Sequence, residues 1–229
     1  MSTSFILVHS PLVGPGTWLA VARRLASRGH VAHIPPIRLD DIDAPYDVAI
    51  AGGIAAQVGD GPPAILALHS GAGALAPAIA RRVPLTGVIF VDAVLPTPGR
   101  SWFDTAPRSL GEHLRDLARD GTLPPWPAWF GEEIMSRLLP YAPLREAFTE
   151  ECPPLPLAYF EEPASAEPMP VDLPAAYLQL SEGYAEEADR ARTLGWLIRA
   201  EALHHLALLT HPDRIATHLD EMAKELAAL

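Results

Sequence analysis

Residues 64–75 read Ala64-Ile-Leu-Ala-Leu-His69-Ser70-Gly71-Ala72-Gly73-Ala-Leu75, an apolar run that changes abruptly into small residues. A short, continuous apolar run predicts a strand buried on both faces, which is typical of a parallel sheet. The small residues that follow predict a helix that packs close to the end of that strand. The sequence therefore predicts a sharp strand-to-helix turn with the Ser70 hydroxyl exposed at its tip.

The same alternation of apolar runs and helical patterns extends along most of the chain. Five more apolar runs predict strands: Phe5–Val8, Val31–Pro35, Gly87–Asp92, Ala175–Leu180 and Trp196–Glu201. Segments of helical period lie between and after the strands: Thr17–Gly29, Tyr46–Val58, Gly71–Arg82, Tyr184–Leu194 and His211–Leu229. This order predicts an α/β fold, a doubly wound and mostly parallel sheet of about six strands in a single domain over residues 1–229.

The alternation stops between about residues 97 and 173, after the fourth predicted strand. This stretch is rich in proline and holds Trp102, Trp126 and Trp129. Proline ends helices early, so we expect short helices inserted as a cap, or lid, over the sheet. A disordered linker is the alternative, and the bulky aromatic side chains argue against it.

Composition and charge exclude several classes of protein. The 229 residues are 49% hydrophobic and 20% charged, with a net charge of −11. That charge disfavours non-specific binding to nucleic acid or to an anionic membrane surface. The single cysteine, Cys152, allows no intramolecular disulfide. The sequence has no basic and apolar leader pattern and no membrane-spanning run, so we expect a cytoplasmic protein. It has no metal-ligand spacing, so we expect a protein that uses no metal or cofactor and acts on a small molecule.

Chemically versatile side chains stand where predicted strands end. His9, His69, Ser70 and Asp92 all occupy such positions. Ligands of open parallel sheets bind outside the carboxyl ends of the strands. A serine hydroxyl needs an adjacent base to become a nucleophile, so serine, histidine and aspartate together indicate a hydrolytic site. A phosphate-binding or packing turn is the alternative for Ser70.

Two segments resemble motifs of the α/β-hydrolase family. Residues 64–73 are similar to its nucleophile turn, Gly-x-Ser-x-Gly, although Leu68 and Ala72 replace the two glycines. The segment from Leu203 to Pro212 resembles the family's catalytic-histidine loop, in which the distance to the proline selects His205. His204 is the alternative. The resemblance implies the α/β-hydrolase fold, with Ser70 as nucleophile and His205 as base.

The resemblance leaves two candidates for the acid of the triad. Many members of the family carry it after the strand that here ends near Leu180, where Glu182 is the available carboxylate. A minority carry it one strand earlier, and the segment that ends at Asp92 resembles that arrangement. Asp92 is the preferred acid and Glu182 the alternative.

The oxyanion hole departs from the family pattern. Its first donor would be the N–H of Gly71, and the second would come from the loop after the first strand. Pro11 falls where that second donor is commonly found, and proline has no N–H. The N–H of Leu12 or the hydroxyl of Ser10 would have to serve instead.

These features predict a serine hydrolase that cleaves an ester, thioester or lactone bond of a small, largely apolar substrate through an acyl-enzyme. We expect substrate contacts from six residues, of which any single aromatic could equally be lid core: Ser10, His69, Trp102, Trp126, Trp129 and Phe130. An acyltransferase or cyclase on the same scaffold is one alternative. The other is a non-catalytic binding homologue, which the departures at Pro11 and Leu68 favour.

Overall fold

Six parallel strands form the central sheet of the protein. The computed structural model describes residues 2–39 and 42–228. Met1, at the start of the predicted domain, and Leu229, at the end of the predicted last helix, lie outside the described residues. The sheet order is β2-β1-β3-β4-β7-β8. The bounds are β1 Ser4–Val8, β2 Val31–His33, β3 Ala64–Ser70, β4 Leu85–Ala93, β7 Ala175–Gln179 and β8 Leu197–Ala200. All six predicted strands are present, and β2 is shorter than predicted, since Pro35 and Pro36 cannot donate to a ladder.

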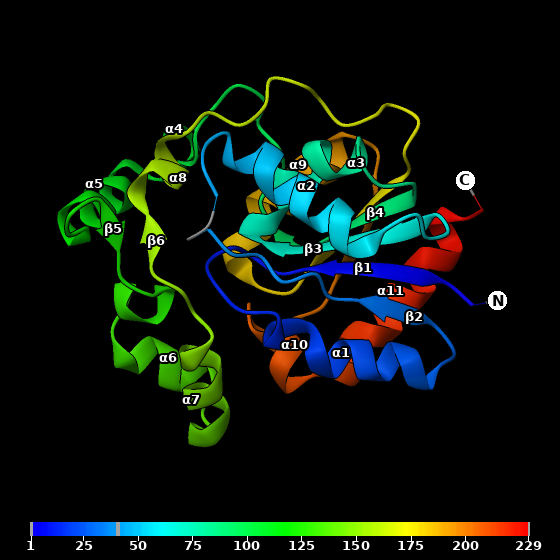
Figure 1. Ribbon diagram of the computed structural model, residues 1–229. Coiled ribbons are helices and arrows are strands. Elements are labelled where there is room, and N and C mark those ends of the chain that lie inside the picture. The colour runs from blue at the N-terminus through cyan, green and yellow to red at the C-terminus, as the bar shows by residue number, and fades with distance from the viewer. Residues whose placement is uncertain (1, 40–41, 229) are drawn as a thin grey trace.

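Helices cover both faces of this sheet (Figure 1). Below it in that view lie α1 (Gly16–Ser27), α10 (Ala207–Thr210) and α11 (Pro212–Leu226). Above it lie α2 (Tyr46–Val58), α3 (Ala76–Ala80) and α9 (Ala185–Thr193). The chain therefore has the doubly wound architecture that the alternation of strands and helices predicted.

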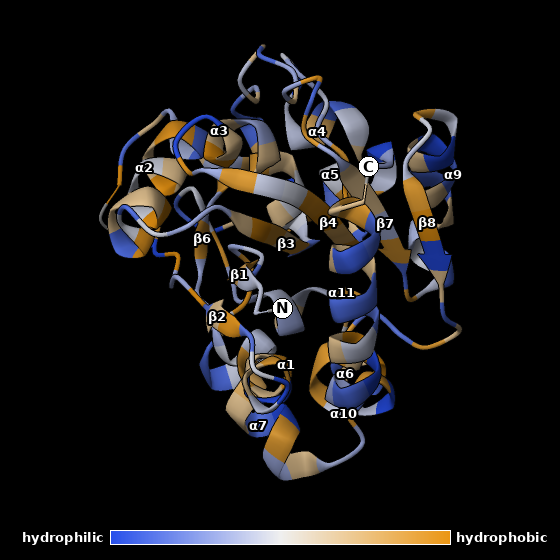
Figure 2. Cartoon of the chain, turned by 90° about the vertical axis from the view of Figure 1, so that its right-hand side faces the viewer, coloured by the Kyte–Doolittle hydropathy of each residue, from blue (hydrophilic) through white to orange (hydrophobic). Residues whose placement is uncertain are grey.

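The four central strands, β1, β3, β4 and β7, are largely apolar because each side of the sheet is a separate core, whereas the edge strands β2 and β8 are partly exposed. In β3, Ile65 and Ala67 belong to the core that includes Trp18 of α1. Leu66 and Leu68 belong to the core on the opposite face, under α2 and α3. Figure 2 shows hydrophobic colour along much of the sheet, with a hydrophilic end on the edge strand β8, beside helices with mixed faces. Burial of one such leucine or isoleucine stabilises the fold by about 1.5–3 kcal/mol.

The helix predicted over Gly71–Arg82 is shorter and begins differently. Residues Gly71–Leu75 form a 3-10 helix, and only Ala76–Ala80 are α-helical. Pro77 has no N–H to donate to the Gly73 carbonyl, and the N–H of Ala76 bonds that carbonyl instead. This i→i+3 bond tightens the turn that follows Ser70.

The inserted segment, residues 94–174, connects β4 to β7 and lies beyond the carboxyl ends of the sheet strands (Figure 1). It is built from short elements, as its prolines predicted. They are α4 (Trp102–Thr105), α5 (Arg108–Leu117), β5 (Thr122–Leu123), a 3-10 turn (Trp126–Trp129), α6 (Glu132–Leu138), α7 (Ala142–Glu150), β6 (Leu155–Pro156) and α8 (Leu157–Glu161). Strands β5 and β6 pair antiparallel as a separate small sheet.

The inserted segment packs directly on the loops that follow β1 and β8. Met135 of α6 and Phe148 of α7 share a buried cluster with Val13 and Leu206. The Glu151 carboxylate accepts the N–H of Gly16, at the start of α1, at 2.7 Å. Both polar and apolar contacts thus fix the insert over the strand ends. Among the described residues, no helix is long and apolar enough to cross a membrane.

Candidate active site

Ser70 stands at the carboxyl end of β3 in a strained backbone conformation. Its φ is 58° and its ψ is −129°, a region that non-glycine residues rarely adopt. The strain turns the side chain away from the sheet, at the edge that faces the inserted segment. The tight approach that follows is made at Gly73, where a Cβ would lie 2.0 Å from the Val94 carbonyl oxygen. Leu68, which replaces a family glycine, is buried in the core.

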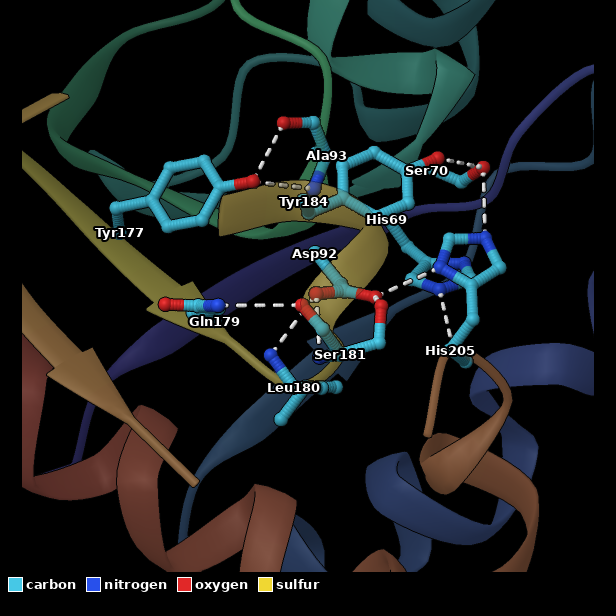
Figure 3. Close-up of polar contacts among 10 residues, drawn as sticks. All are labelled: His69, Ser70, Asp92, Ala93, Tyr177, Gln179, Leu180, Ser181, Tyr184 and His205. Carbon is cyan, nitrogen blue, oxygen red and sulfur yellow. Dashed lines mark hydrogen bonds and ion pairs between the residues drawn. The ribbon is translucent and has the colours of Figure 1, made fainter. Parts of the chain in front are cut away.

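Three side chains from separate segments form one hydrogen-bonded chain (Figure 3). Ser70 Oγ lies 3.0 Å from His205 Nε2. His205 Nδ1 lies 2.8 Å from Asp92 Oδ2. Because a carboxylate only accepts, Nδ1 carries the proton of the neutral ring, and the free lone pair of Nε2 accepts the Ser70 O–H. This geometry suits general-base activation of a hydroxyl.

Asp92 is completely buried at the end of β4, with a φ of 44°. Its Oδ1 accepts the backbone N–H groups of Leu180 and Ser181 at 2.9 and 3.0 Å. Its Oδ2 accepts the Ser181 hydroxyl at 2.6 Å as well as His205. Burial disfavours the charge, but the hydrogen bonds from His205, Ser181 and Leu180 outweigh it and hold the pKa of Asp92 below its ordinary value.

The alternative candidates lie elsewhere. Glu182 is exposed in the 3-10 turn Glu182–Tyr184 after β7, whereas Asp92 is the carboxylate on His205. His204 bonds through Nε2 to the Thr210 hydroxyl at 2.9 Å. Of each pair, the structure brings Asp92 and His205 to Ser70, as the sequence analysis preferred.

His69 lies beneath the site and does not open onto it. The residue is 1% exposed, and its Nε2 donates to the His205 carbonyl oxygen at 2.9 Å. The two imidazole rings also stack, with centroids 4.6 Å apart. Burial, followed by the charge on His205, lowers the pKa of His69 to about 3. His69 is therefore neutral and supports the loop that carries His205, a location that gives no direct substrate contact.

The candidate oxyanion hole has one clear donor. Gly71 begins its 3-10 helix, so its N–H has no acceptor within that helix. The N–H of Leu12 instead points to Ser10 Oγ, at 3.3 Å. Ser10 is buried, and its Oγ would lie 3.0 Å from a Cβ on Gly71. The second predicted donor, Leu12, is thus engaged within its own loop.

A buried histidine fixes that loop. The N–H of Ile37 donates to His9 Nε2 at 3.1 Å, so the proton of the neutral ring resides on Nδ1. His9 Nδ1 then donates to the Ser10 carbonyl oxygen at 2.8 Å. Burial lowers the pKa of His9, which keeps the ring neutral and in this tautomer.

Of the four aromatic residues predicted to line a pocket, Trp126 lies nearest the base. Its ring centroid is 6.4 Å from that of His205. Trp102 and Trp129 instead pack against Phe160 inside the inserted segment. Phe130 packs edge-to-face against Trp126, with ring centroids 5.9 Å apart, and is 37% exposed. The structure therefore places Trp102 and Trp129 in the core of the insert, the location that the sequence analysis weighed equally with substrate contact for any single aromatic residue.

Two residues at the site were not among the predicted ones. Ser181 donates to Asp92, and Tyr184 approaches Ser70 with its hydroxyl, 3.3 Å from Ser70 Oγ. The Tyr184 ring stacks on His205, with centroids 4.8 Å apart and an interplanar angle of 5°. Both residues follow β7, and no local sequence pattern indicated a role for either of them. Among the residues that the structure describes, no group of three or more His, Cys, Asp or Glu could hold a metal ion.

Comparison in sequence identifies no relative. No protein-family model matches the chain, and no curated protein matches it.

Comparison in structure finds many similar folds. An extracellular α/β-hydrolase from a Paenibacillus species, described as a structural and functional homologue of tobacco salicylic acid binding protein 2, superposes with a TM-score of 0.78 at 20% identity, over 96% of this chain and 98% of that one. A pyrethroid hydrolase from Sphingobium faniae gives a TM-score of 0.71 at 20% identity over 100% of both chains. Tomato methylketone synthase I gives 0.68 at 13% identity over 99% of both. The sheet order, the serine turn and these superpositions together identify the fold of this chain as the α/β-hydrolase fold.

Proposed function

We propose that this protein is a serine hydrolase that cleaves an ester, thioester or lactone bond of a small, largely apolar substrate. The observation that carries the proposal is the unbroken chain from Ser70 through His205 to Asp92, at 3.0 and 2.8 Å. A hydroxyl, an imidazole and a buried carboxylate in this order can activate a nucleophile and return its proton.

The proposed reaction has two halves. Ser70 Oγ attacks the carbonyl carbon while His205 Nε2 takes the hydroxyl proton, and the Gly71 N–H stabilises the oxyanion. His205 returns that proton to the departing alcohol or thiol, which leaves an acyl group on Ser70. Water then attacks the acyl group, with His205 again as base, and Ser70 recovers its proton when the acid departs. Asp92 holds the required tautomer and stabilises the imidazolium.

The structural neighbours support this reaction class. Several of them are hydrolases or esterases by name, among them the pyrethroid hydrolase and polyneuridine aldehyde esterase. At 20% identity or less in these two cases, the likeness supports the reaction class and leaves the substrate open.

The inserted segment is the proposed lid of the site. It packs on the loops that carry Leu12 and His205, and it places Trp126 beside the base. An indole at this position provides an apolar surface for an acyl or aromatic group. We therefore assign substrate selection to the insert.

A fluorophosphonate probe tests the proposal directly. We expect the wild-type protein to be labelled at Ser70 and to hydrolyse p-nitrophenyl butyrate, and Ser70→Ala to lose both properties. Ser136→Ala is the matched control, because Ser136 is a half-buried helix residue of the insert that bonds only within its own helix. Labelling of folded Ser70→Ala, or none of folded wild type, would contradict the proposal.

A ligand-binding protein without catalysis is the second candidate. It is favoured by the oxyanion hole, where Pro11 has no N–H and that of Leu12 bonds Ser10. Loss of one such donor slows other serine hydrolases by about 10²–10³-fold. A folded wild-type protein that the probe does not label would support this candidate.

A further inference from the structure

We propose that Tyr184 is a catalytic residue, whose hydroxyl donates a hydrogen bond to Ser70 Oγ and speeds the breakdown of the acyl-enzyme. This inference rests on the proposed serine hydrolase function and adds a residue to its machinery. It is carried by the 3.3 Å contact between Tyr184 and Ser70 and by the stacking of the Tyr184 ring on His205. Figure 3 shows the tyrosine beside the serine and the two histidines.

The direction of the Tyr184–Ser70 hydrogen bond follows from the rest of the chain. His205 Nδ1–H donates a hydrogen bond to Asp92, so Nε2 has only a lone pair to offer Ser70. Ser70 has one hydroxyl proton, and it uses that proton to donate a hydrogen bond to the Nε2 lone pair. Its oxygen can therefore only accept from Tyr184, and the tyrosine O–H is the donor.

The environment of Tyr184 keeps that donor in place. Burial raises the pKa of the phenol to about 12, so the hydroxyl holds its proton throughout the neutral range. The ring lies parallel to His205 at 4.8 Å, and this contact fixes where the hydroxyl points. The donor is thus ordered before any substrate arrives, which avoids reorganisation during the reaction.

A donor on Ser70 Oγ acts unequally on the two halves of the reaction. Before acylation the hydroxyl oxygen already accepts this hydrogen bond, so little is gained as Ser70 attacks. In the acyl-enzyme, Oγ is an ester oxygen whose lone pair is delocalised into the carbonyl, and it accepts weakly. When water adds, the delocalisation ends, and charge builds on Oγ as its bond to carbon breaks. The bond from Tyr184 strengthens only there, so it lowers the barrier to deacylation.

No atom leaves Tyr184 in this scheme. The proton that Ser70 recovers comes from His205, which took it from the attacking water. The tyrosine contributes one hydrogen bond, whose typical strength corresponds to a rate factor of about tenfold.

The test compares Tyr184→Phe with Tyr141→Phe. The first keeps the ring that stacks on His205 and removes only the hydroxyl. The second removes the same atom from an exposed tyrosine at the start of α7, with 68% of its surface accessible. Thermal melting of both variants checks that each is folded. Single-turnover experiments with p-nitrophenyl butyrate then follow release of p-nitrophenol and, by intact mass, the acyl group on Ser70.

We expect the acyl-enzyme of Tyr184→Phe to decay about tenfold more slowly than wild type, while fluorophosphonate labelling and the release of p-nitrophenol change by less than about threefold. In the steady state, kcat and KM should fall together, and Tyr141→Phe should match wild type. Acyl-enzyme decay in Tyr184→Phe at the wild-type rate would overturn the role of Tyr184, although Ser70-dependent labelling would still support the hydrolase. Slower labelling with unchanged decay would overturn it too. An unlabelled wild type would overturn both proposals.

Discussion

His69 donates its Nε2 proton to the backbone carbonyl of His205 at 2.9 Å, across 136 positions of sequence. The residue before the candidate nucleophile therefore holds the loop of the candidate base, independently of the Ser70–His205 contact. Because a protonated imidazole would place a charge in a buried stack, this support depends on a neutral His69.

Protonation of His69 predicts how stability changes with pH. The ordinary pKa of 6.5 applies to the unfolded chain, and burial lowers the folded value to about 3. Between these values the unfolded chain binds more protons, so stability falls as the pH falls below 6.5. The His69 contribution at pH 5 is a loss of about 2 kcal/mol in the free energy of unfolding relative to neutral pH.

We expect His69→Gln, measured by urea unfolding at pH 7.5 and 5, to lose less stability on acidification than wild type. His33→Gln, at an exposed position, should behave like wild type, and a slope unchanged in His69→Gln would refute this account.

The two candidate acids are separated by neutralising each in turn. Asp92→Asn keeps the shape of the side chain, but its amide N–H can donate a hydrogen bond to Nδ1 of His205. This favours the tautomer with the proton on Nε2, which cannot accept the Ser70 proton. We expect kcat for p-nitrophenyl butyrate to fall by about 10⁴-fold, the size of the effect of the same change in another triad. Glu182→Gln, at an exposed position, should change kcat less than about twofold. The reverse ranking would place the acid after β7.

The close approach after Ser70 predicts a severe effect of one methyl group. In Gly73→Ala the new Cβ would lie 2.0 Å from the Val94 carbonyl oxygen, which is backbone and cannot swing aside. We expect a loss of about 1–3 kcal/mol in urea unfolding, and lower esterase activity because the turn that holds Ser70 must shift. Gly53→Ala is the control, since a Cβ there meets nothing within 4 Å in the exposed face of α2. It should stabilise by roughly 0.5–1 kcal/mol, and equal effects of the two changes would be evidence against a tight turn.

The contact of Glu151 with Gly16 predicts that the insert is held from its α7 end. The carboxylate accepts a backbone N–H at the start of a 12-residue helix, where a negative charge is favoured. Glu151→Ala should lower the free energy of unfolding by about 1 kcal/mol and speed trypsin cleavage within the insert. The neighbouring exposed Glu150 provides the control, and Glu150→Ala should leave both measurements within error of wild type. Identical proteolysis of the two variants would show that apolar packing alone holds the insert.

Sequence alone determined the fold and the position of the candidate nucleophile turn. The central strands β1, β3, β4 and β7 are buried on both faces, so their apolar runs are continuous and readable, and Ser70 lies at the end of such a run. The insert was also readable, because its prolines interrupt the helical period. The turn after Ser70 was less so, since the 3-10 helix depends on one missing N–H at Pro77.

The tertiary structure decided which polar groups meet. Asp92, rather than Glu182, faces His205 because β4 lies between β3 and β7 in the sheet, with its carboxyl end beside that of β7. Tyr184 approaches Ser70, and His69 is buried against His205, through contacts between segments far apart in the chain. The Leu12 N–H is engaged by Ser10 through a bend within one loop. Local pattern encodes which face of a strand or helix is buried, whereas these pairings depend on directions of side chains that only the packed sheet fixes.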